Sequence, residues 1–177
     1  MSMVVAIWYS GTGMSTVIHQ ACLLLGSNIE PERNIPQAVI LLRDKLTILQ
    51  ASSIWESASV DCSYPDYLNM ALSVSTPLDA TQLKEHVLRP LEAQMGRVRT
   101  EDKNASRPID FDIILFDGAL LDPTLWQYAH RAVPVAELFP DYHSKDGDSL
   151  KDVAARLAQS TPVQVRKDIS VSLPSQS

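Results

Sequence analysis

Tyr67-Leu-Asn-Met-Ala-Leu-Ser-Val-Ser75 places large apolar residues at its even positions and smaller or polar residues at its odd positions. Successive side chains of a β-strand point to opposite faces of the sheet, so this period of two predicts a strand with one face in the core. Upstream, the apolar run Ala21-Cys-Leu-Leu-Leu25 stops at Gly26-Ser-Asn28, which is typical of a central strand. Three further strands are expected, over 47–57, 108–116 and 163–165, the last at an edge.

Helical spacing lies between these strands. Apolar residues recur on one face over 34–46, and Pro36 is tolerable there only in a first turn, so Asn34 is the expected N-cap. A second helix begins near Asp79 and should be bent by Pro90; its core positions recur every four residues up to Gly96, at Leu83, Val87, Leu91 and Met95. A last helix is expected over 148–158.

The resulting order, β-α-β-β-α-β, predicts the fold class. It is typical of an α/β (α+β) fold of the ferredoxin-like, split βαβ type, with an antiparallel sheet and helices packed on one face. The length of 177 residues suits a single domain. We expect a flexible N-terminal extension over 1–18, the folded domain over 19–167, and a flexible polar tail over 168–177.

Composition excludes several classes of function. The net charge of −6 argues against non-specific nucleic-acid binding, and no apolar run reaches the roughly 18–20 residues of a membrane span. Cys22 and Cys62 are isolated, so neither a disulfide framework nor a zinc site is indicated. We expect a soluble cytoplasmic protein, a monomer or weak homodimer, with no nucleic-acid or membrane partner.

Asp110-Phe-Asp112 is the sharpest chemical feature. Residues two apart on a strand share a face, so both carboxylates should meet while Phe111 and its apolar neighbours enter the core. Paired carboxylates suit Mg²⁺, which proteins hold with one or two carboxylates and substrate phosphates. The alternative is an exposed strand face that carries two solvated acids.

A basic cluster precedes this strand: Arg97, Arg99, Lys103 and Arg107 fall within eleven residues. Arginine forks match phosphate oxygens, and a solvated charged loop is the alternative. Together the acidic pair and the basic cluster favour phosphoryl transfer without identifying a substrate. His130 and Arg131, in one late loop, could also reach a polyphosphate.

Six segments, in order and correctly spaced over about 21–140, resemble the 6-hydroxymethyl-7,8-dihydropterin pyrophosphokinase family (2-amino-4-hydroxy-6-hydroxymethyldihydropteridine diphosphokinase). They are Leu25-Gly-Ser-Asn28, Ser52-Ser-Ile-Trp-Glu-Ser57, Pro65-Asp-Tyr-Leu-Asn69, Leu91-Glu-Ala-Gln-Met-Gly-Arg-Val-Arg99, Arg107-Pro-Ile-Asp-Phe-Asp-Ile-Ile-Leu-Phe116 and Val133-Pro-Val-Ala-Glu-Leu138. The resemblance implies a kinase of folate biosynthesis that transfers pyrophosphate from ATP to the hydroxymethyl group of a dihydropterin, leaving AMP. It also implies the ferredoxin-like fold.

The resemblance also implies roles for individual residues. Asp110 and Asp112 match the pair that holds two Mg²⁺ ions, and with Arg97 and Arg107 they form the expected catalytic set. The expected ATP-binding residues are Glu92, Arg97, Arg99, Arg107, His130 and Arg131. The expected pterin-binding residues are Gly26, Ser57, Tyr67 and Asn69, where the Asn69 amide would read the amide edge of the pterin.

Two segments depart from the family pattern. Ser57-Ala-Ser59 stands where the family has Thr-Pro-Pro, and the segment 127–133 is compressed. Either His130 or Arg131 matches the phosphate-contacting residue, and the pterin-stacking Phe has no counterpart unless Tyr128 or Trp126 replaces it. Two alternatives therefore stay open: a divergent member with altered pterin specificity, and a non-catalytic binding module, against which the acidic charge and the absence of paired strand aromatics count.

Overall fold

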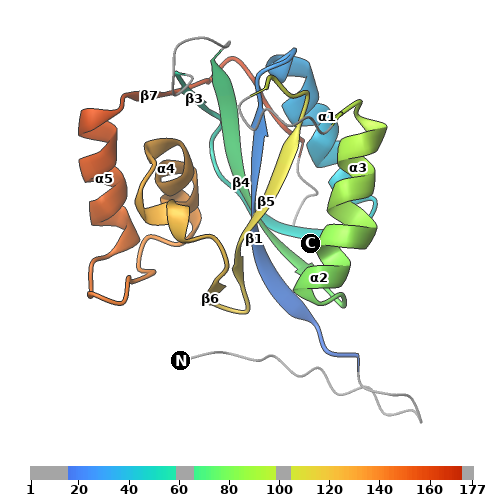
Figure 1. The fold of residues 1–177 in the computed structure, drawn as a ribbon, viewed down its shortest axis with the longest axis horizontal. Helices are drawn as coiled ribbons and strands as arrows, with labels where there is room; N and C mark the ends of the chain where they lie inside the picture. The colour runs from blue at the N-terminus through green and yellow to red at the C-terminus, as the bar shows by residue number, and fades with distance from the viewer. Residues whose placement is uncertain (1–15, 59–65, 99–104, 173–177) are drawn as a thin grey trace.

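The structure, a computed structural model, describes residues 16–58, 66–98 and 105–172. Within them one antiparallel sheet has seven strands, in the order β6-β5-β1-β4-β3-β7, with β2 also paired to β4 (Figure 1). The strands are β1 (His19–Ser27), β2 (Thr47–Ala51), β3 (Trp55–Ser57), β4 (Tyr67–Thr76), β5 (Asp110–Phe116), β6 (Ala119–Leu120) and β7 (Val163–Val165). The predicted fold class, an antiparallel sheet with packed helices, is confirmed.

The helices follow in chain order. They are α1 (Pro31–Arg43), α2 (Ala80–Leu83), the π-helical turn η1 (Lys84–Leu88), α3 (Arg89–Gln94), the 3₁₀ turn η2 (Pro123–Trp126), α4 (Ala129–Leu138) and α5 (Leu150–Ser160). The expected helix over 148–158 is α5. In the described ranges, no helix combines the length and apolar character that crossing a bilayer requires.

Helices cover both faces of the sheet, which corrects the expectation of one covered face (Figure 1). Odd-numbered residues of β1, such as Leu23 and Leu25, belong to the core cluster that contains the buried residues of α1 and α3. The even-numbered Cys22 and Leu24 belong to the cluster formed with α4 and α5. A strand with apolar residues at both odd and even positions is buried on both faces of its sheet. The run Ala21–Leu25 has this pattern.

The first helix begins earlier than predicted. Pro31 takes the first helical position, where its missing N–H is not needed, and Glu30 (φ 40°) is the N-cap. Asn34 is therefore inside the helix, and its Nδ2 donates to the Ile29 carbonyl (2.7 Å). Pro36 lies in the second turn, so the helix forgoes one backbone hydrogen bond there.

The second helix follows its prediction closely. Asp79 and Gln82 form a capping box in which each side chain accepts from the other's backbone N–H (2.8 and 3.1 Å). The turn widens into η1 directly before Pro90, where a regular turn would bring the ring against a carbonyl. Gly96 follows the helix with φ +87°, the left-handed conformation expected at that position.

The predicted strand over 47–57 is two strands. Ser52 interrupts it: its backbone N–H donates to the Ala71 carbonyl and its hydroxyl accepts from the Ala71 N–H, both at 2.9 Å. After this break β3 pairs with both β4 and β7. Farther along the chain, Ile169 and Val171 pack against the core cluster of α1 and α3, so these residues of the expected tail contact the domain.

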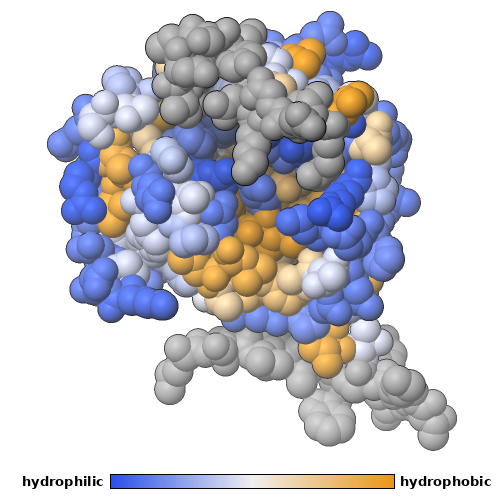
Figure 2. Space-filling view, viewed as in Figure 1, coloured by the Kyte–Doolittle hydropathy of each residue, from blue (hydrophilic) through white to orange (hydrophobic). Residues whose placement is uncertain are grey.

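Strand β5 lies at the sheet edge over most of its length, because β6 pairs only with its last two residues. Figure 2 shows an apolar surface where β5 lies in Figure 1, flanked by hydrophilic surface on both sides. On β5 the half-buried Ile113 and Phe116 pack against the α1–α3 core. Asp110 begins β5 and lies at the opposite end of the strand from Phe116.

Candidate active site

The pairing register brings one predicted metal ligand and two predicted pterin-binding residues into one row. Gly26 on β1 lies opposite Asp110 on β5 and opposite Asn69 on β4. Their neighbours Leu25, Phe111 and Met70 enter the α1–α3 core, so this row faces the other side of the sheet, where α4 and α5 lie. Asp112, two residues beyond Asp110, shares that face.

Gly26 is loosely surrounded by the described residues. Of their heavy atoms beyond its chain neighbours, only the Asn69 Oδ1 would lie within 4 Å of a Cβ placed on Gly26, at 3.5 Å. The amide of Asn69 is held from the opposite end, since its Nδ2 donates to Ser57 Oγ (2.9 Å). Its oxygen therefore lies toward Gly26, whose partner on β5 is Asp110. Tyr67 pairs with Ser57, two residues farther along the strands than the pair of Asn69 with Trp55.

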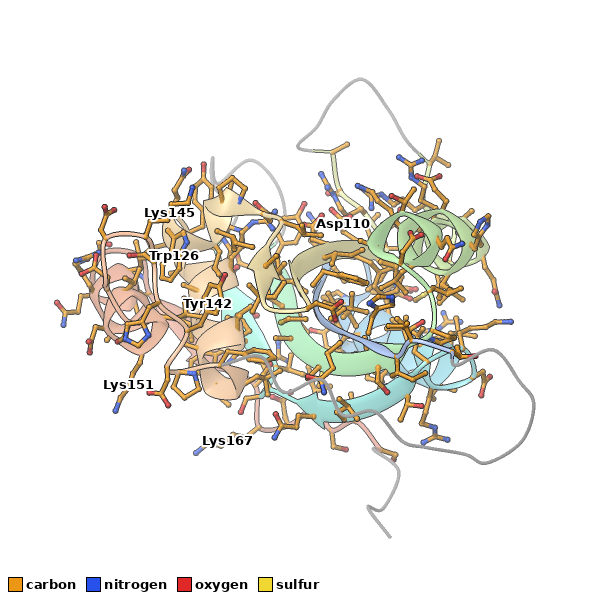
Figure 3. All side chains as sticks on the ribbon, turned by 90° about the horizontal axis from the view of Figure 1, so that it is seen from below. Asp110, Trp126, Tyr142, Lys145, Lys151 and Lys167 are labelled. Carbon is orange, nitrogen blue, oxygen red and sulfur yellow. The ribbon has the colours of Figure 1, made fainter. Side chains whose placement is uncertain are left out.

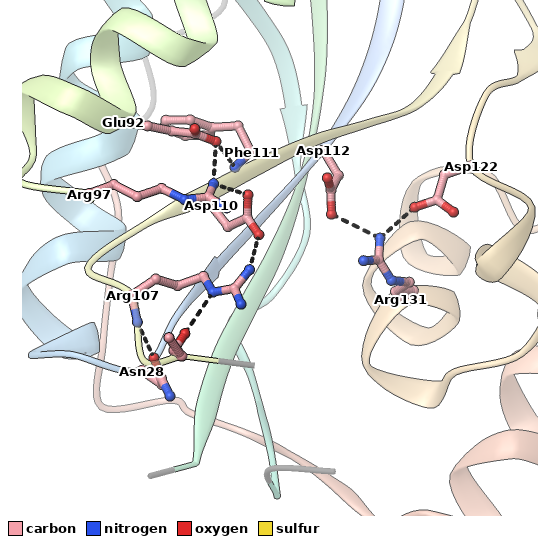
Figure 4. A network of polar contacts seen from close by, with 10 residues as sticks. Asn28, Glu92, Arg97, Arg107, Asp110, Phe111, Asp112, Asp122 and Arg131 are labelled. Atoms are coloured by element: carbon pink, nitrogen blue, oxygen red, sulfur yellow. Dashed lines mark hydrogen bonds and ion pairs between the residues drawn. The ribbon is translucent and has the colours of Figure 1, made fainter. Parts of the chain in front are cut away.

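Two arginines hold Asp110 (Figure 4). Arg97 Nη1 contacts Asp110 Oδ1, and Arg107 Nη1 donates to Asp110 Oδ2 at 2.7 Å. Burial alone raises the pKa of the Asp110 carboxyl, but the charge of Arg97 and the hydrogen bonds from both arginines outweigh it, so the pKa lies below its ordinary value. Asp110 is thus ionised at neutral pH and carries two counter-ions.

Glu92 supports Arg97 from inside the protein. Its carboxylate, 3% exposed, accepts from Arg97 Nη1 (2.6 Å) and from the backbone N–H of Phe111 (3.0 Å). The second bond satisfies a backbone donor on the open edge of β5. The predicted nucleotide-pocket acid is therefore engaged with protein groups and fixes the arginine at Asp110.

The Gly-Ser-Asn segment after β1 fastens the chain around Arg107. Asn28 Oδ1 accepts from the Arg107 N–H (2.7 Å), and the Asn28 N–H donates to the Arg107 carbonyl (3.1 Å). Ser27 Oγ donates to the Pro108 carbonyl (2.6 Å). Asn28 was not among the predicted site residues, although it lies in the quoted segment; a polar residue after a strand is typical of any turn.

A third arginine holds Asp112. Arg131 Nη1 lies 3.0 Å from Asp112 Oδ2 and 2.6 Å from Asp122 Oδ2. Burial and the nearby charge of Asp110 raise the pKa of the Asp112 carboxyl above its ordinary value, against the opposing effect of Arg131. Asp122 is a further residue that the sequence did not single out. Of the two aspartates, Asp112 has the more exposed side chain, 38% against 22% for Asp110.

His130 and Arg131 lie in the first turn of α4, which corrects the prediction of a late loop. The His130 ring stacks on Tyr128 (centroids 5.4 Å apart). Burial, followed by the charge of Arg131, lowers the pKa of His130 to about 4, so its imidazole is neutral at neutral pH. Arg131 is thus the member of the pair that reaches the acidic strand.

Of the two aromatic residues that could replace the missing Phe, Trp126 has a partner elsewhere. It stacks on Tyr142 with centroids 6.0 Å apart, and in Figure 3 the two lie together, apart from Asp110. Tyr128 is 42% exposed and precedes α4 directly. Arg99, the remaining predicted ATP-binding residue, and Lys103 of the basic cluster lie outside the described residues.

The donor set at Asp110 and Asp112 fits a Mg²⁺ site. Two carboxylates share one strand face, and the charge of one raises the pKa of the other, a repulsion that a divalent cation would relieve. Three guanidinium groups supply the positive charge in the structure. In the described ranges no three His, Cys, Asp or Glu side chains gather as a metal cluster, so the remaining ligands would be phosphate and water oxygens, as Mg²⁺ commonly accepts.

Comparisons with known proteins agree with this arrangement. Residues 22–140 match the model of the 7,8-dihydro-6-hydroxymethylpterin-pyrophosphokinase (HPPK) family. A curated relative, the folate synthesis bifunctional protein of Arabidopsis thaliana, is 29% identical over 151 residues, which are 79% of this chain and 30% of that protein. This chain therefore spans less than a third of that relative.

Solved structures share the fold at low identity. Wild-type Plasmodium falciparum HPPK-DHPS with pteroate superposes with a TM-score of 0.64 at 11% identity, covering 80% of this chain and 43% of that one. A variant of the same protein with pteroate gives 0.64 at 10% identity, covering 83% and 44%.

Proposed function

This chain belongs to the 7,8-dihydro-6-hydroxymethylpterin-pyrophosphokinase family, and on that premise we propose that it transfers the pyrophosphoryl group of ATP to the hydroxymethyl group of 6-hydroxymethyl-7,8-dihydropterin in folate biosynthesis. The observation that carries the proposal is the row Asp110–Gly26–Asn69, in which a glycine without a side chain separates an arginine-held carboxylate from a fixed amide. In this proposal the triphosphate lies over Asp110 and the acceptor lies beside it, over Gly26 and Asn69.

The phosphate side of the site consists of Asp110, Asp112 and the arginines. Asp110 and Asp112 would hold two Mg²⁺ ions, which neutralise the charge of the triphosphate when bound. Arg97 and Arg107, fixed on Asp110, would meet the phosphates and stabilise the charge that develops during transfer. Glu92 would act through Arg97, and Arg99 remains a proposed ATP contact.

Between His130 and Arg131, Arg131 is the proposed ATP contact. It already reaches Asp112, whereas the neutral His130 is occupied by its stacking on Tyr128. A guanidinium has five N–H donors in a fixed fork and always carries its charge, so it suits a polyphosphate better than a neutral imidazole does.

The acceptor side consists of Gly26, Ser57, Tyr67 and Asn69. Ser57 holds the amide of Asn69 so that Oδ1 can accept from an N–H of the pterin, and Gly26 leaves room for the ring. The hydroxymethyl oxygen attacks the β-phosphorus and loses its proton, while the bond from the β-phosphorus to the α-phosphate oxygen breaks and AMP leaves. Catalysis is then mainly positioning and charge stabilisation.

A second candidate is transfer to a different pterin. It is favoured by the stacking of Trp126 on Tyr142, which leaves the exposed Tyr128 as the remaining candidate to replace the family's pterin-stacking Phe. In both versions the partners are ATP and a small pterin, the assembly is a monomer or weak homodimer, and the place of action is the cytoplasm, as the sequence leads us to expect.

The test is AMP formation from ATP and Mg²⁺, measured with and without 6-hydroxymethyl-7,8-dihydropterin. Pterin-dependent AMP is the expected result, with Asp112→Asn inactive and Asp146→Asn, in the exposed loop before α5, unchanged as a control for the lost charge. AMP formed only with another pterin supports the second candidate. If no pterin yields AMP, the proposed reaction is wrong.

A further inference from the structure

Asp122 uses its two carboxylate oxygens for different purposes. Oδ1 caps the 3₁₀ turn η2, accepting from the Thr124 N–H (3.0 Å) and the Thr124 hydroxyl (2.6 Å). Oδ2 accepts from Arg131 Nη1 at 2.6 Å. Because the cap fixes the orientation of the carboxylate, the oxygen that meets Arg131 is held in place before any ligand binds.

Arg131 is shared between two carboxylates through a single nitrogen. Nη1 contacts both Asp112 and Asp122, as the dashed lines of Figure 4 mark. Within residues 16–58, 66–98 and 105–172, Nε and Nη2 of Arg131 have no hydrogen-bond partner. The side chain is 21% exposed, so these N–H groups can meet a ligand without breaking the contact to Asp122.

We propose that Asp122 is a positioning residue: it retains Arg131 beside Asp112, so that Arg131 is the counter-ion of Asp112 in the ligand-free protein and yields Asp112 to a divalent cation without leaving the site. This inference rests on the proposed metal site at Asp110 and Asp112. What it adds is an exchange of cations on Asp112: the divalent cation takes the place of Arg131. The released guanidinium stays on Asp122, where its Nε and Nη2 N–H groups bind the triphosphate.

The exchange makes two substitutions act in opposite directions on metal affinity. Arg131→Met removes the competing cation from Asp112, so a divalent cation should bind the ligand-free protein more tightly. Asp122→Asn removes the second anion that attracts Arg131, so Arg131 pairs with Asp112 alone and the cation must displace a stronger partner. The amide introduced by Asp122→Asn can still cap η2, because its oxygen accepts from the Thr124 N–H as the carboxylate does.

The direct test uses Mn²⁺ as the probe, with free Mn²⁺ counted by electron paramagnetic resonance on the full chain without nucleotide. For exposed or half-exposed ion pairs we expect changes of about fivefold: tighter Mn²⁺ binding in Arg131→Met and weaker binding in Asp122→Asn. Asp146→Asn is the matched control for one lost negative charge. Melting temperatures of all variants identify any loss of folding.

A second measurement follows the nucleotide. Affinity for α,β-methylene-ATP with Mg²⁺ should fall by about tenfold in both single variants, because each loses the positioned guanidinium. In the Arg131→Met background Asp122→Asn should have no further effect, which a residue acting only as a turn cap would not produce. Arg131→Lys should recover part of the affinity, since it keeps the charge without the fork.

The inference is overturned if Asp122→Asn leaves Mn²⁺ affinity unchanged, if both single variants shift it in the same direction, or if their effects on nucleotide affinity add. No Mn²⁺ binding by the parent protein, with or without the analogue, would overturn the metal site and the exchange together. These readouts need no pterin, so a failure of the proposed reaction, seen in AMP formation, is distinguished from a failure of this inference.

Discussion

Gly26 and Asn69 are direct cross-strand partners, and a Cβ on Gly26 would lie 3.5 Å from the Asn69 amide oxygen. That separation is an ordinary van der Waals contact, and the backbone at Gly26 is not left-handed, so the folded protein itself does not require glycine there. In the proposed function, the missing side chain makes room for the acceptor between Asp110 and Asn69.

Gly26→Ala should leave folding intact and weaken acceptor binding. A strand position generally favours alanine over glycine by about 0.5–1 kcal/mol, so unfolding in urea should show no loss of stability. The added methyl occupies the room proposed for the pterin, and we expect KM for the pterin to rise by about tenfold or more while the affinity for α,β-methylene-ATP is unchanged. Equal losses in both affinities would contradict the proposed position of the pterin.

Substitutions of Asp110 and Asp112 should differ in their effect on the free energy of unfolding but have the same effect on activity. Asp110→Asn leaves two half-buried arginines without their shared anion and should cost about 1–3 kcal/mol of unfolding free energy. Asp112→Asn removes a charge that burial and Asp110 disfavour, and Arg131 keeps Asp122, so stability should be unchanged or slightly higher.

Both variants should lose about 10²-fold or more in AMP formation, because each removes a proposed metal ligand, and Asp110→Asn also removes the anion that holds Arg97 and Arg107. Urea unfolding at pH 7.5 and initial rates are the measurements. If the two variants were equally destabilised, the unequal environments of the two carboxylates would be wrong.

His130 should make stability depend on pH between about 4 and 6.5. Its pKa is about 4 in the folded protein and about 6.5 in an unfolded chain, so the unfolded state binds more protons in this window. Stability therefore falls as pH falls below 6.5, by roughly 1–3 kcal/mol for a largely buried ring. His130→Gln should flatten this part of the curve relative to the parent.

The matched control is His86→Gln on the exposed side of the second helix, which should keep the parent's slope. Contributions of the carboxylates are common to the three proteins and cancel in the comparison. A His130→Gln protein with the same slope as the parent would show that the imidazole titrates normally in the folded state.

Glu92 should tolerate an amide better than an apolar side chain. Glu92→Gln keeps an oxygen that accepts from the Phe111 N–H but loses the charge that holds Arg97, and should cost about 1–2 kcal/mol. Glu92→Leu removes both bonds, leaves the buried Phe111 N–H without its acceptor and leaves Arg97 with Asp110 alone, so we expect about 3–5 kcal/mol. Urea unfolding measures both; equal costs would show that the Phe111 bond contributes nothing.

Much of the sheet was predictable because each strand carries a periodic signal. The alternation over 67–75 gave β4 and its core face, and the apolar run at 21–25 gave β1 as a central strand. That same run is apolar at its odd and its even positions, a pattern typical of a strand buried on both faces. The helical layer on the second face, however, includes α4. Helix α4 contains Pro134, and no side chain caps its N-terminus, so the local sequence does not predict where this helix begins.

Of the site, the residues that share a strand face were predictable and those that act across elements were not. Asp110 and Asp112 follow from strand geometry. Asp122-Pro-Thr is a recognisable turn start, but nothing in the sequence says that the second oxygen of Asp122 holds an arginine nine residues later. Asn28 likewise needs the fold, since its bonds to Arg107 join residues 79 apart.

The bond from Phe111 to Glu92 has a consequence beyond the site. An unpaired strand edge is a template on which a second polypeptide can add a strand, and proteins close such edges to remain dispersed. Here the group that occupies one donor of that edge is also the acid that holds a proposed catalytic arginine. Loss of the Glu92 carboxylate should therefore favour self-association through β5 as well as loosen Arg97.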